Sequence, residues 1–178
     1  LRRLDKPMRR IMIAGGGNIG YRLASSLESR YELKLIEHSR LRAEFLSSHL
    51  HKTLVLAGDT TDEMLLEAEN IDDMDLYLAL TNDDENNIMS SLMAKRMGAG
   101  RVVALINRKA YVDLVQAGAI DIAISPAQVS IGSLLAHVRR GDVVAVHSLR
   151  RGAAEALELV VHGDRKTSKV IGRRIEEI

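Results

Sequence analysis

The stretch Arg10-Ile-Met-Ile-Ala-Gly-Gly-Gly-Asn-Ile-Gly20 decides the fold of this chain, because it joins an apolar run to three glycines spaced G-x-G-x-x-G. In a strand-turn-helix unit, Gly15 allows the tight turn, Gly17 lets the backbone approach a pyrophosphate, and Gly20 lets the helix pack closely on the sheet. The phosphates then lie at a helix N-terminus, where unpaired N–H groups and the helix dipole favour negative charge. The stretch therefore predicts a dinucleotide-binding turn.

An acidic residue at the end of the next apolar run supports the same interpretation. The run Leu33-Lys-Leu-Ile-Glu37 ends 22 positions after Gly15, where about 20 are expected for the residue that binds the adenine-side ribose. The Glu37 carboxylate would accept hydrogen bonds from the ribose hydroxyls and repel a 2′-phosphate, so NAD(H) is preferred over NADP(H). Arg40 and Arg42 follow closely and weaken that preference. The alternative for Glu37 is a solvated acid at a strand end.

Composition indicates a protein with an aliphatic core. Of the 178 residues, 46% are hydrophobic but only 3% are aromatic, which suits buried parallel strands covered by helices. The 25 basic and 24 acidic residues nearly cancel, and no basic stripe is interleaved with aromatics, so nucleic acid is not the expected partner. No window approaches the roughly 18 unbroken apolar residues of a spanning helix, no signal peptide is recognisable, and cysteine is missing. We expect a soluble protein that reaches a membrane only through a protein partner.

Short apolar runs alternate with helical patterns along most of the chain, which is typical of repeated βα units and a parallel sheet. The predicted fold is therefore α/β, with a Rossmann-like, doubly wound and mainly parallel six-stranded sheet. We place strands near residues 10–14, 33–37, 53–57, 75–80, 101–106 and 120–124, and helices near residues 18–30, 40–50, 61–69, 84–97 and 109–117.

The pattern changes after Ser125-Pro126. Apolar residues at i, i+3, i+4 and i+7 mark one face of a further helix, which packs either on its own sheet or on a neighbouring subunit. Beyond this helix, two strands and the start of a helix open a small α+β subdomain. The helix stripe is Ile131, Leu134, Leu135 and Val138, and the later elements are Val143–Val146, Leu157–Val161 and Lys169–Ile178.

Polar residues follow the third, fourth and fifth strands, at the sheet edge where open α/β sheets bind ligands. Asp59 could contact an adenine amino group, while Thr81 and Asn82 could line the pyrophosphate and the second nucleoside. Arg108 places a guanidinium at the same edge, where it is suited to phosphate recognition. The alternatives are helix caps that need no ligand and an ordinary surface arginine.

Catalytic and metal-binding patterns are weak. The acidic clusters near Asp72 and Asp83 are explained by a solvated loop and a charged helix start, and His49 and His51 lack further ligands, so we predict no metal site. Neither a G-x-S-x-G elbow nor a Walker-type loop occurs, and no catalytic shell follows the sixth strand. We predict a nucleotide-binding module without enzymatic activity. The alternative is the nucleotide-binding domain of an NAD-dependent oxidoreductase.

Several of these motifs together resemble the RCK (KTN) domains that regulate potassium channels and transporters. Within that family the chain is most similar to the second half of the regulatory subunit of a bacterial potassium-uptake system. The resemblance covers nearly the whole chain. It is carried by Gly15-Gly-Gly-Asn-Ile-Gly20, Glu37, Gly58-Asp-Thr60, Thr81-Asn-Asp-Asp-Glu-Asn86 and Ala119-Ile-Asp-Ile-Ala-Ile-Ser-Pro126.

The resemblance implies a regulatory subunit controlled by NAD⁺/NADH or ATP/ADP, held on the cytoplasmic face of the inner membrane by a Trk-type potassium transporter. It also implies a ring of such domains, joined through the striped helix as a crossover helix. The implied nucleotide contacts are Gly15, Gly16, Gly17, Asn18 and Ile19 for the phosphates, with Gly20 completing the turn, Glu37 for the ribose, Asp59 and Thr60 for the adenine, Thr81 and Asn82 for the middle of the ligand, and Arg108 for a phosphate.

The implied domain boundaries follow the same resemblance. Residues 10–140 would form the Rossmann domain with its crossover helix at about 127–140, and residues 141–178 would open the C-terminal RCK subdomain. Because the chain begins with Leu1 rather than Met, we expect a piece of a longer polypeptide in which residues 1–9 end a linker.

Overall fold

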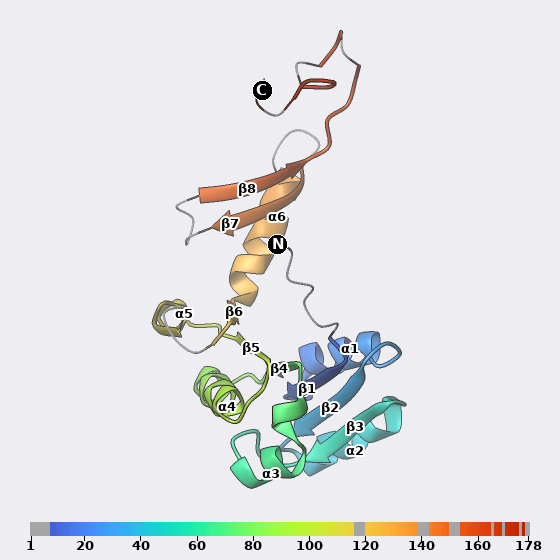
Figure 1. The fold of residues 1–178 in the computed structure, drawn as a ribbon, viewed down its shortest axis with the longest axis vertical. Helices are drawn as coiled ribbons and strands as arrows, with labels where there is room; N and C mark the ends of the chain where they lie inside the picture. Colours follow the sequence, from blue (N-terminus) through green and yellow to red (C-terminus); the bar gives the residue numbers. More distant parts are fainter. Residues whose placement is uncertain are drawn as a thin grey trace. The chain divides into compact units, whose positions relative to one another are not determined.

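The computed structural model describes residues 8–115, 120–138, 143–149, 154–164, 166–168, 170–174 and 176. By internal contacts the chain divides into two units, Leu1–Pro126 and Ala127–Ile178, which are described separately. Figure 1 follows the elements along the chain.

The first unit is built on a six-stranded sheet in which every paired strand is parallel. Its order is β3-β2-β1-β4-β5-β6, as predicted for a Rossmann-like sheet. The strands are β1 (Arg10–Ala14), β2 (Glu32–Glu37), β3 (Thr53–Ala57), β4 (Leu76–Ala79), β5 (Arg101–Leu105) and β6 (Ile122–Ile124). The helices are α1 (Asn18–Leu27), α2 (Arg40–His49), α3 (Glu63–Ala68), the 3₁₀ turn η1 (Ile71–Asp73), α4 (Asp84–Arg96) and α5 (Lys109–Val115).

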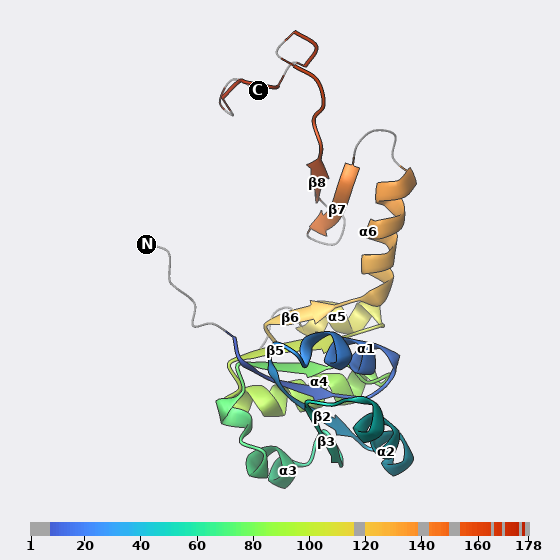
Figure 2. The same cartoon turned by 90° about the vertical axis from the view of Figure 1, so that its right-hand side faces the viewer.

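The two faces of the sheet carry separate cores because successive side chains of a strand point to opposite faces. Ile11 and Ile13 of β1 join the core beneath α1 and α2, whereas Met12 and Ala14 join the core beneath α3, α4 and α5. Figure 2 shows α1 and α4 on opposite sides of the sheet. The fold is therefore doubly wound, as the alternating pattern predicted.

The helices begin and end where the sequence supplies the required side chains. The side chains of Ser39, Asp62 and Asp83 each accept a backbone N–H at the start of α2, α3 and α4. Gly98, with a φ of 110°, follows Met97 at the end of α4, where glycine commonly ends a helix.

The second unit is described from α6 (Pro126–Val138) and a hairpin of antiparallel strands, β7 (Val143–Leu149) and β8 (Ala154–Leu159). The grouping of α6 with the first unit stays a prediction. The expected helix over residues 169–178 is wrong for the described residues, because 170–172 form a bend and turn and Gly172 has a φ of 75°. A left-handed residue interrupts a right-handed helix. None of the described helices is long and apolar enough to span a bilayer.

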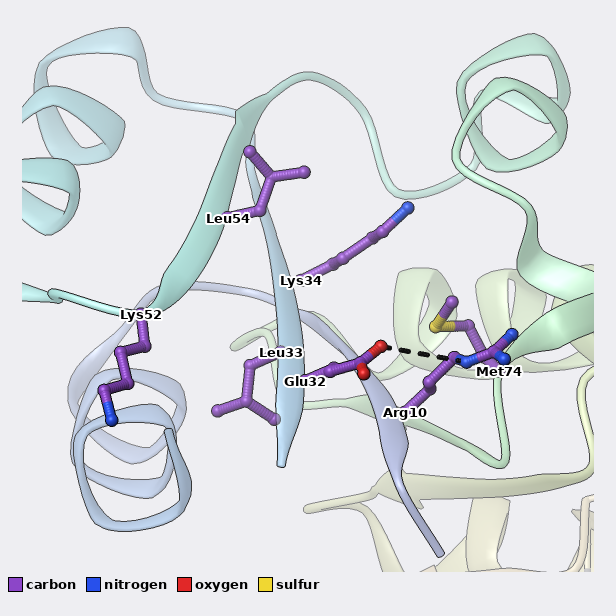
Figure 3. Close-up of a pocket in the computed structure, with 7 residues that line it drawn as sticks. All are labelled: Arg10, Glu32, Leu33, Lys34, Lys52, Leu54 and Met74. Carbon is purple, nitrogen blue, oxygen red and sulfur yellow. Dashed lines mark ion pairs between the residues drawn. The ribbon is translucent and has the colours of Figure 1, made fainter. Parts of the chain in front are cut away.

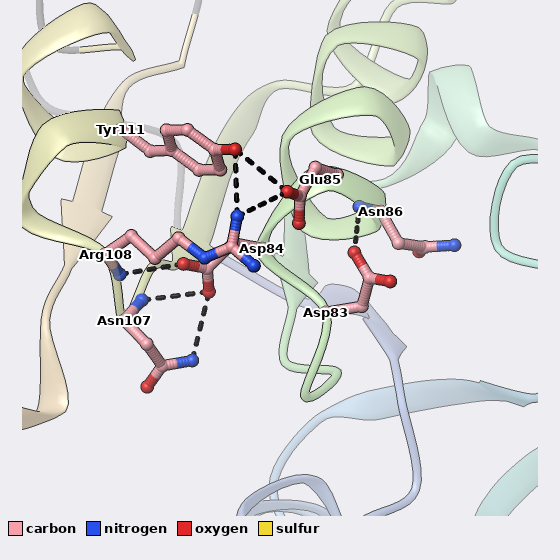
Figure 4. A network of polar contacts seen from close by, with 7 residues as sticks. All are labelled: Asp83, Asp84, Glu85, Asn86, Asn107, Arg108 and Tyr111. Atoms are coloured by element: carbon pink, nitrogen blue, oxygen red, sulfur yellow. Dashed lines mark hydrogen bonds and ion pairs between the residues drawn. The ribbon is translucent and has the colours of Figure 1, made fainter.

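The first turn of α4 ties together two loops at the carboxyl edge of the sheet. The Asp84 carboxylate accepts hydrogen bonds from the N–H groups of Asn107 and Arg108, at 2.9 and 2.7 Å, and from the Asn107 side chain at 3.0 Å (Figure 4). The fully buried Asn87 accepts from the Thr81 N–H at 2.9 Å and donates to the Leu105 carbonyl at 2.8 Å. These bonds hold the ends of β4 and β5 in one arrangement.

Asp84 is expected to stabilise the fold as an anion. Burial of its carboxyl favours the neutral form, but the N–H bonds from Asn107 and Arg108 outweigh this effect and hold the pKa of Asp84 below its ordinary value. Because the folded-state pKa lies below the unfolded value of about 3.9, the stabilisation is complete above that pH and is lost as the pH falls through the folded-state pKa.

We therefore predict that Asp84→Asn lowers the free energy of unfolding by about 1–3 kcal/mol at pH 7. The amide NH₂ group that replaces one carboxylate oxygen would face a backbone N–H group, and two donors cannot form a hydrogen bond with each other. Urea unfolding from pH 7 to pH 3 should show the difference from the wild type shrinking at the acid end. Asp72→Asn, at an exposed carboxylate, is the matched control and should change little. A pH-independent difference would contradict the anionic role.

Candidate functional site

The strand order places a crevice at the carboxyl ends of β1 and β4. The chain moves from β1 outward to β2 and β3, and then returns to the other side of β1 at β4. Ligands of open α/β sheets bind outside the strand ends at such a reversal. The loop that follows β1 lies close to the loop that follows β4. A Cβ atom built on Gly15 would lie only 2.9 Å from the Thr81 backbone nitrogen.

The three glycines of the motif have different surroundings. Gly15 has a φ of 104°, which favours glycine, and its N–H donates to the Ile36 carbonyl at 2.8 Å. A Cβ on Gly20 would overlap the Gly15 carbonyl oxygen, so this glycine permits close packing of α1 on the turn. A Cβ on Gly17, in contrast, would have no atom within 4 Å. Protein atoms therefore crowd the turn at Gly15 and Gly20, whereas Gly17 faces open space.

The open glycine is the N-cap of α1. No side chain caps this helix end and its first turn contains no acidic residue. A helix leaves its first N–H groups without partners inside the helix, and these groups attract anions. Asn18 and Ile19 occupy this turn and are exposed. The described residues here have the chemistry of a phosphate site.

Glu37 lies against the glycine turn and is only 6% exposed. Its Oε2 accepts the Gly16 N–H at 2.9 Å, and its Oε1 accepts the Ser39 N–H at 2.8 Å and lies 3.0 Å from His38 Nδ1. The carboxylate therefore holds the turn to the end of β2. A contact with a ribose hydroxyl would have to be made in addition to these bonds.

Arg42 is a second charged residue on the same turn, and its contact with the glycine loop was not predicted. Its Nε donates to the Gly16 carbonyl at 2.9 Å. Both polar groups of the Gly16 backbone are therefore bound by charged side chains, the N–H by Glu37 and the carbonyl by Arg42. The position of Arg42 in the first turn of α2 was the available signal, but the partner is not visible in the sequence.

The residues after β3 divide between the surface and the interior. Asp59 is exposed, and the N–H and hydroxyl of Thr61 donate to its carboxylate and hold its pKa below the ordinary value. Thr60 is buried and donates to Asn86 Oδ1 at 2.6 Å. Asp59 is therefore an anion available to a ligand, whereas Thr60 joins β3 to α4.

Thr81 and Asn82 lie next to the crevice. The Thr81 hydroxyl donates to Asn87 Oδ1 at 2.7 Å, so Asn87 fixes both the N–H and the side chain of this residue. Asn82 is exposed and lines a hollow of about 250 Å³ with Asp83, Asp84, Glu85, Asn107 and Arg108. No role was predicted for Asn87 from the sequence, because the motif that carries the resemblance ends at Asn86.

Arg108 reaches across to α4 (Figure 4). Its Nη1 donates to Glu85 Oε1 at 2.7 Å and to the Tyr111 hydroxyl at 2.9 Å, and the Tyr111 hydroxyl donates to the same Glu85 oxygen. The side chain of Arg108 is 62% exposed. The structure thus brings Arg108 to the predicted edge, but with a carboxylate as its partner.

A second hollow lies at the opposite edge of the sheet, near the starts of β1 and β2 (Figure 3). Arg10, Glu32 and Lys34 border it, and Arg10 Nε lies 3.8 Å from Glu32 Oε2. Ligands of this fold bind at the carboxyl ends of the strands, so this hollow is not the candidate site. Among the described residues, no group of three or more histidine, aspartate or glutamate side chains could hold a metal ion.

Comparison with known proteins agrees with this architecture. The chain is 62% identical, over all of its 178 residues, to proteins named Trk system potassium uptake protein TrkA from Halomonas elongata and Vibrio alginolyticus. It spans 39% of the length of each of these relatives.

Solved structures show the same fold. The TrkA-N domain of the inner membrane protein ybaL from Escherichia coli has a TM-score of 0.67 at 14% identity, covering 75% of this chain and 99% of that one. The GsuK channel bound to NAD has a TM-score of 0.63 at 20% identity, covering 82% of this chain and 26% of that one. GsuK bound to ADP has a TM-score of 0.62 at 18% identity, with coverages of 76% and 35%.

The family described as TrkA-N domain matches residues 11–126, which contain the whole six-stranded sheet and its glycine turn. The resemblance to RCK domains is thereby confirmed, and this chain belongs to the TrkA-N domain family.

Proposed function

We propose that this chain binds an adenine nucleotide in the crevice between β1 and β4 and regulates potassium uptake through that binding. The observation that carries the proposal is the uncapped N-terminus of α1 beside the open face of Gly17. The membership of the TrkA-N family and the names of the relatives supply the transport role. NAD(H) is the preferred ligand, with ATP or ADP as the alternative.

The proposed ligand contacts follow from the geometry. The phosphates would occupy the first turn of α1, and the adenosine would lie on the β2 side of the turn. Asp59 would bind the adenine end, and Thr60 would support it through Asn86. The proposed contacts are Gly15, Gly16, Gly17, Asn18, Ile19 and Gly20 for the phosphates, Glu37 for the ribose, Asp59 and Thr60 for the adenine, and Thr81, Asn82 and Arg108 for the rest of the nucleotide.

The partners that we propose follow from the relatives. The chain would act without catalysis, as part of a cytoplasmic regulatory subunit held at the inner membrane by a Trk-type potassium transporter. Nucleotide binding would shift its conformational equilibrium, because a ligand favours the state that it binds more tightly. Residues 10–140 are the proposed Rossmann domain with the crossover helix, preceded by a linker over residues 1–9. Residues 141–178 are the proposed start of the C-terminal subdomain.

We predict that the purified chain binds NAD⁺ or NADH in a calorimetric titration, with ATP and ADP as comparison ligands. Gly17→Ala should weaken binding at least about tenfold, because the added methyl group occupies the space through which the phosphates approach the backbone. Its melting temperature should stay close to that of the wild type, since the new Cβ meets no protein atom.

Asp72→Asn is the control for the calorimeter, because the exposed Asp72 lines a hollow with Arg9 and Arg10 at the start of β1, away from the glycine turn. Failure of a folded wild-type chain to bind any of the four nucleotides would overturn the proposed function. Robust consumption of NADH with a panel of oxo acids would instead favour an oxidoreductase.

We also propose that α6 joins two copies of the chain. Ile131 and Leu134, which lie three positions apart on the predicted stripe, are 55% and 65% exposed, so this face of the helix leaves branched apolar side chains in contact with water. The occupant that we propose is a second copy, as the resemblance to RCK domains implies.

Leu134→Glu should therefore convert a dimer to a monomer in light scattering, because a buried carboxylate without a partner is strongly unfavourable in an interface. Ser133→Glu, at an exposed position on the opposite face of the same helix, should leave the mass unchanged. An unaltered dimer of folded Leu134→Glu would contradict this interface.

A further inference from the structure

The guanidinium of Arg42 is held in place on the adenosine side of the glycine turn. Its Nε donates to the Gly16 carbonyl at 2.9 Å, and the Arg42 backbone N–H contacts the Ser39 hydroxyl at the start of α2. Gly16 faces α2 and β2, since a Cβ built on it would meet Leu46, Glu37 and Leu35. In this fold the adenine-side ribose lies beyond the end of β2. Arg42 is thus a cation at the ribose end of the proposed site.

Two aromatic rings lie close to this guanidinium. The central carbon of Arg42 lies 4.7 Å from the Phe45 ring centre and 5.8 Å from that of Tyr21. Phe45 stacks in turn on His49, with ring centres 4.0 Å apart. The chain has one phenylalanine and four tyrosines, and two of these side chains lie close to this arginine and limit its movement. An arginine held in this way loses little conformational entropy when it binds a ligand.

Donors remain on Arg42 after these contacts. Arginine has five N–H groups, and within the described part of the chain only the one on Nε has an acceptor. The remaining fork on the two Nη atoms matches the oxygens of a phosphate. The neighbouring Arg40 differs, because its side chain is 88% exposed and its Nε lies 3.5 Å from Glu44 Oε1.

Glu37 is the residue that should reject a phosphate at this ribose, but its oxygens are already in use. Oε2 accepts the Gly16 N–H, Oε1 accepts the Ser39 N–H, and the residue is 6% exposed. A carboxylate with backbone donors on both oxygens has part of its charge compensated. The Arg42 side chain, bound to the other side of the same Gly16 residue, adds an opposite charge close by.

We propose that Arg42 is a specificity-determining residue that binds a 2′-phosphate on the adenine-side ribose, so that the site accepts NADP(H) as well as NAD(H). This inference rests on the proposed nucleotide site and extends the range of its ligands. It removes the selectivity against a 2′-phosphate that is expected from Glu37 alone. Arg42 also positions the glycine turn through Gly16, and this second role is separated from phosphate binding by the experiment.

The test is a calorimetric titration of NADH and NADPH into the wild-type chain, Arg42→Gln, Arg42→Lys and Arg40→Gln, each checked for folding by its melting curve. The wild type should bind the two dinucleotides with dissociation constants within about threefold of each other. Arg42→Gln should weaken NADPH binding at least about tenfold and NADH binding less than about threefold, because only NADPH carries the 2′-phosphate. Arg42→Lys should recover part of the NADPH affinity, and Arg40→Gln should change neither ligand.

Three results would overturn the inference. Tight binding of NADH without binding of NADPH would show that Glu37 sets the selectivity, and the proposed function would stand. Equal weakening of both ligands in folded Arg42→Gln and Arg42→Lys would show that Arg42 acts only through the glycine turn. Failure of the folded wild type to bind either dinucleotide, or ATP and ADP, would overturn the proposed function together with this inference.

Discussion

The close approach between the Gly15 carbonyl and Gly20 is the constraint on which the rest of the site depends. Any side chain at Gly20 would overlap that carbonyl, so α1 can start directly above the end of β1 only with glycine there. The positive φ of Gly15 turns the chain in the same step. Because the turn is this tight, Gly15 lies against the Thr81 backbone of the neighbouring loop, only two residues before the uncapped N-terminus of α1. The phosphate binding that we propose at this edge depends on this backbone geometry.

Charged and amide side chains then hold the tight turn and its neighbours in place. Glu37 and Arg42 bind the two polar groups of the Gly16 backbone, and Asn87 binds the backbone of Thr81 across the crevice. Buried or half-buried hydrogen bonds of this kind are costly to leave unmade, so each favours one loop conformation. A site assembled before its ligand arrives loses less entropy on binding. The edge is therefore preorganised by residues that the glycine motif does not contain.

Sequence patterns predicted the sheet closely, because strand and helix periodicity depend on burial, which the sheet unit satisfies within itself. The six-stranded parallel sheet with helices on both of its faces is confirmed. The predicted helix over residues 169–178 is wrong for the described residues 170–174, because the positive φ of Gly172 interrupts a right-handed helix. The contacts of Arg42 and Asn87 could not be predicted, since each joins elements distant in the sequence and depends on side-chain direction. Pattern reasoning locates the loops but not the bonds between them.

Two adjacent carboxylates on α4 show that neighbouring positions in the sequence can form very different contacts. They also bear on the proposed role of Arg108. One helical position apart, Asp84 is buried and binds backbone N–H groups, whereas Glu85 points to the surface and pairs with Arg108. An exposed ion pair stabilises a protein little because water screens it, and the Arg108 side chain is 62% exposed. In the proposed function, a nucleotide phosphate would therefore replace Glu85 as the partner of Arg108 at small cost. Asp84 meanwhile keeps the backbone of the same loop fixed, so Arg108 can exchange partners without movement of the loop that carries it.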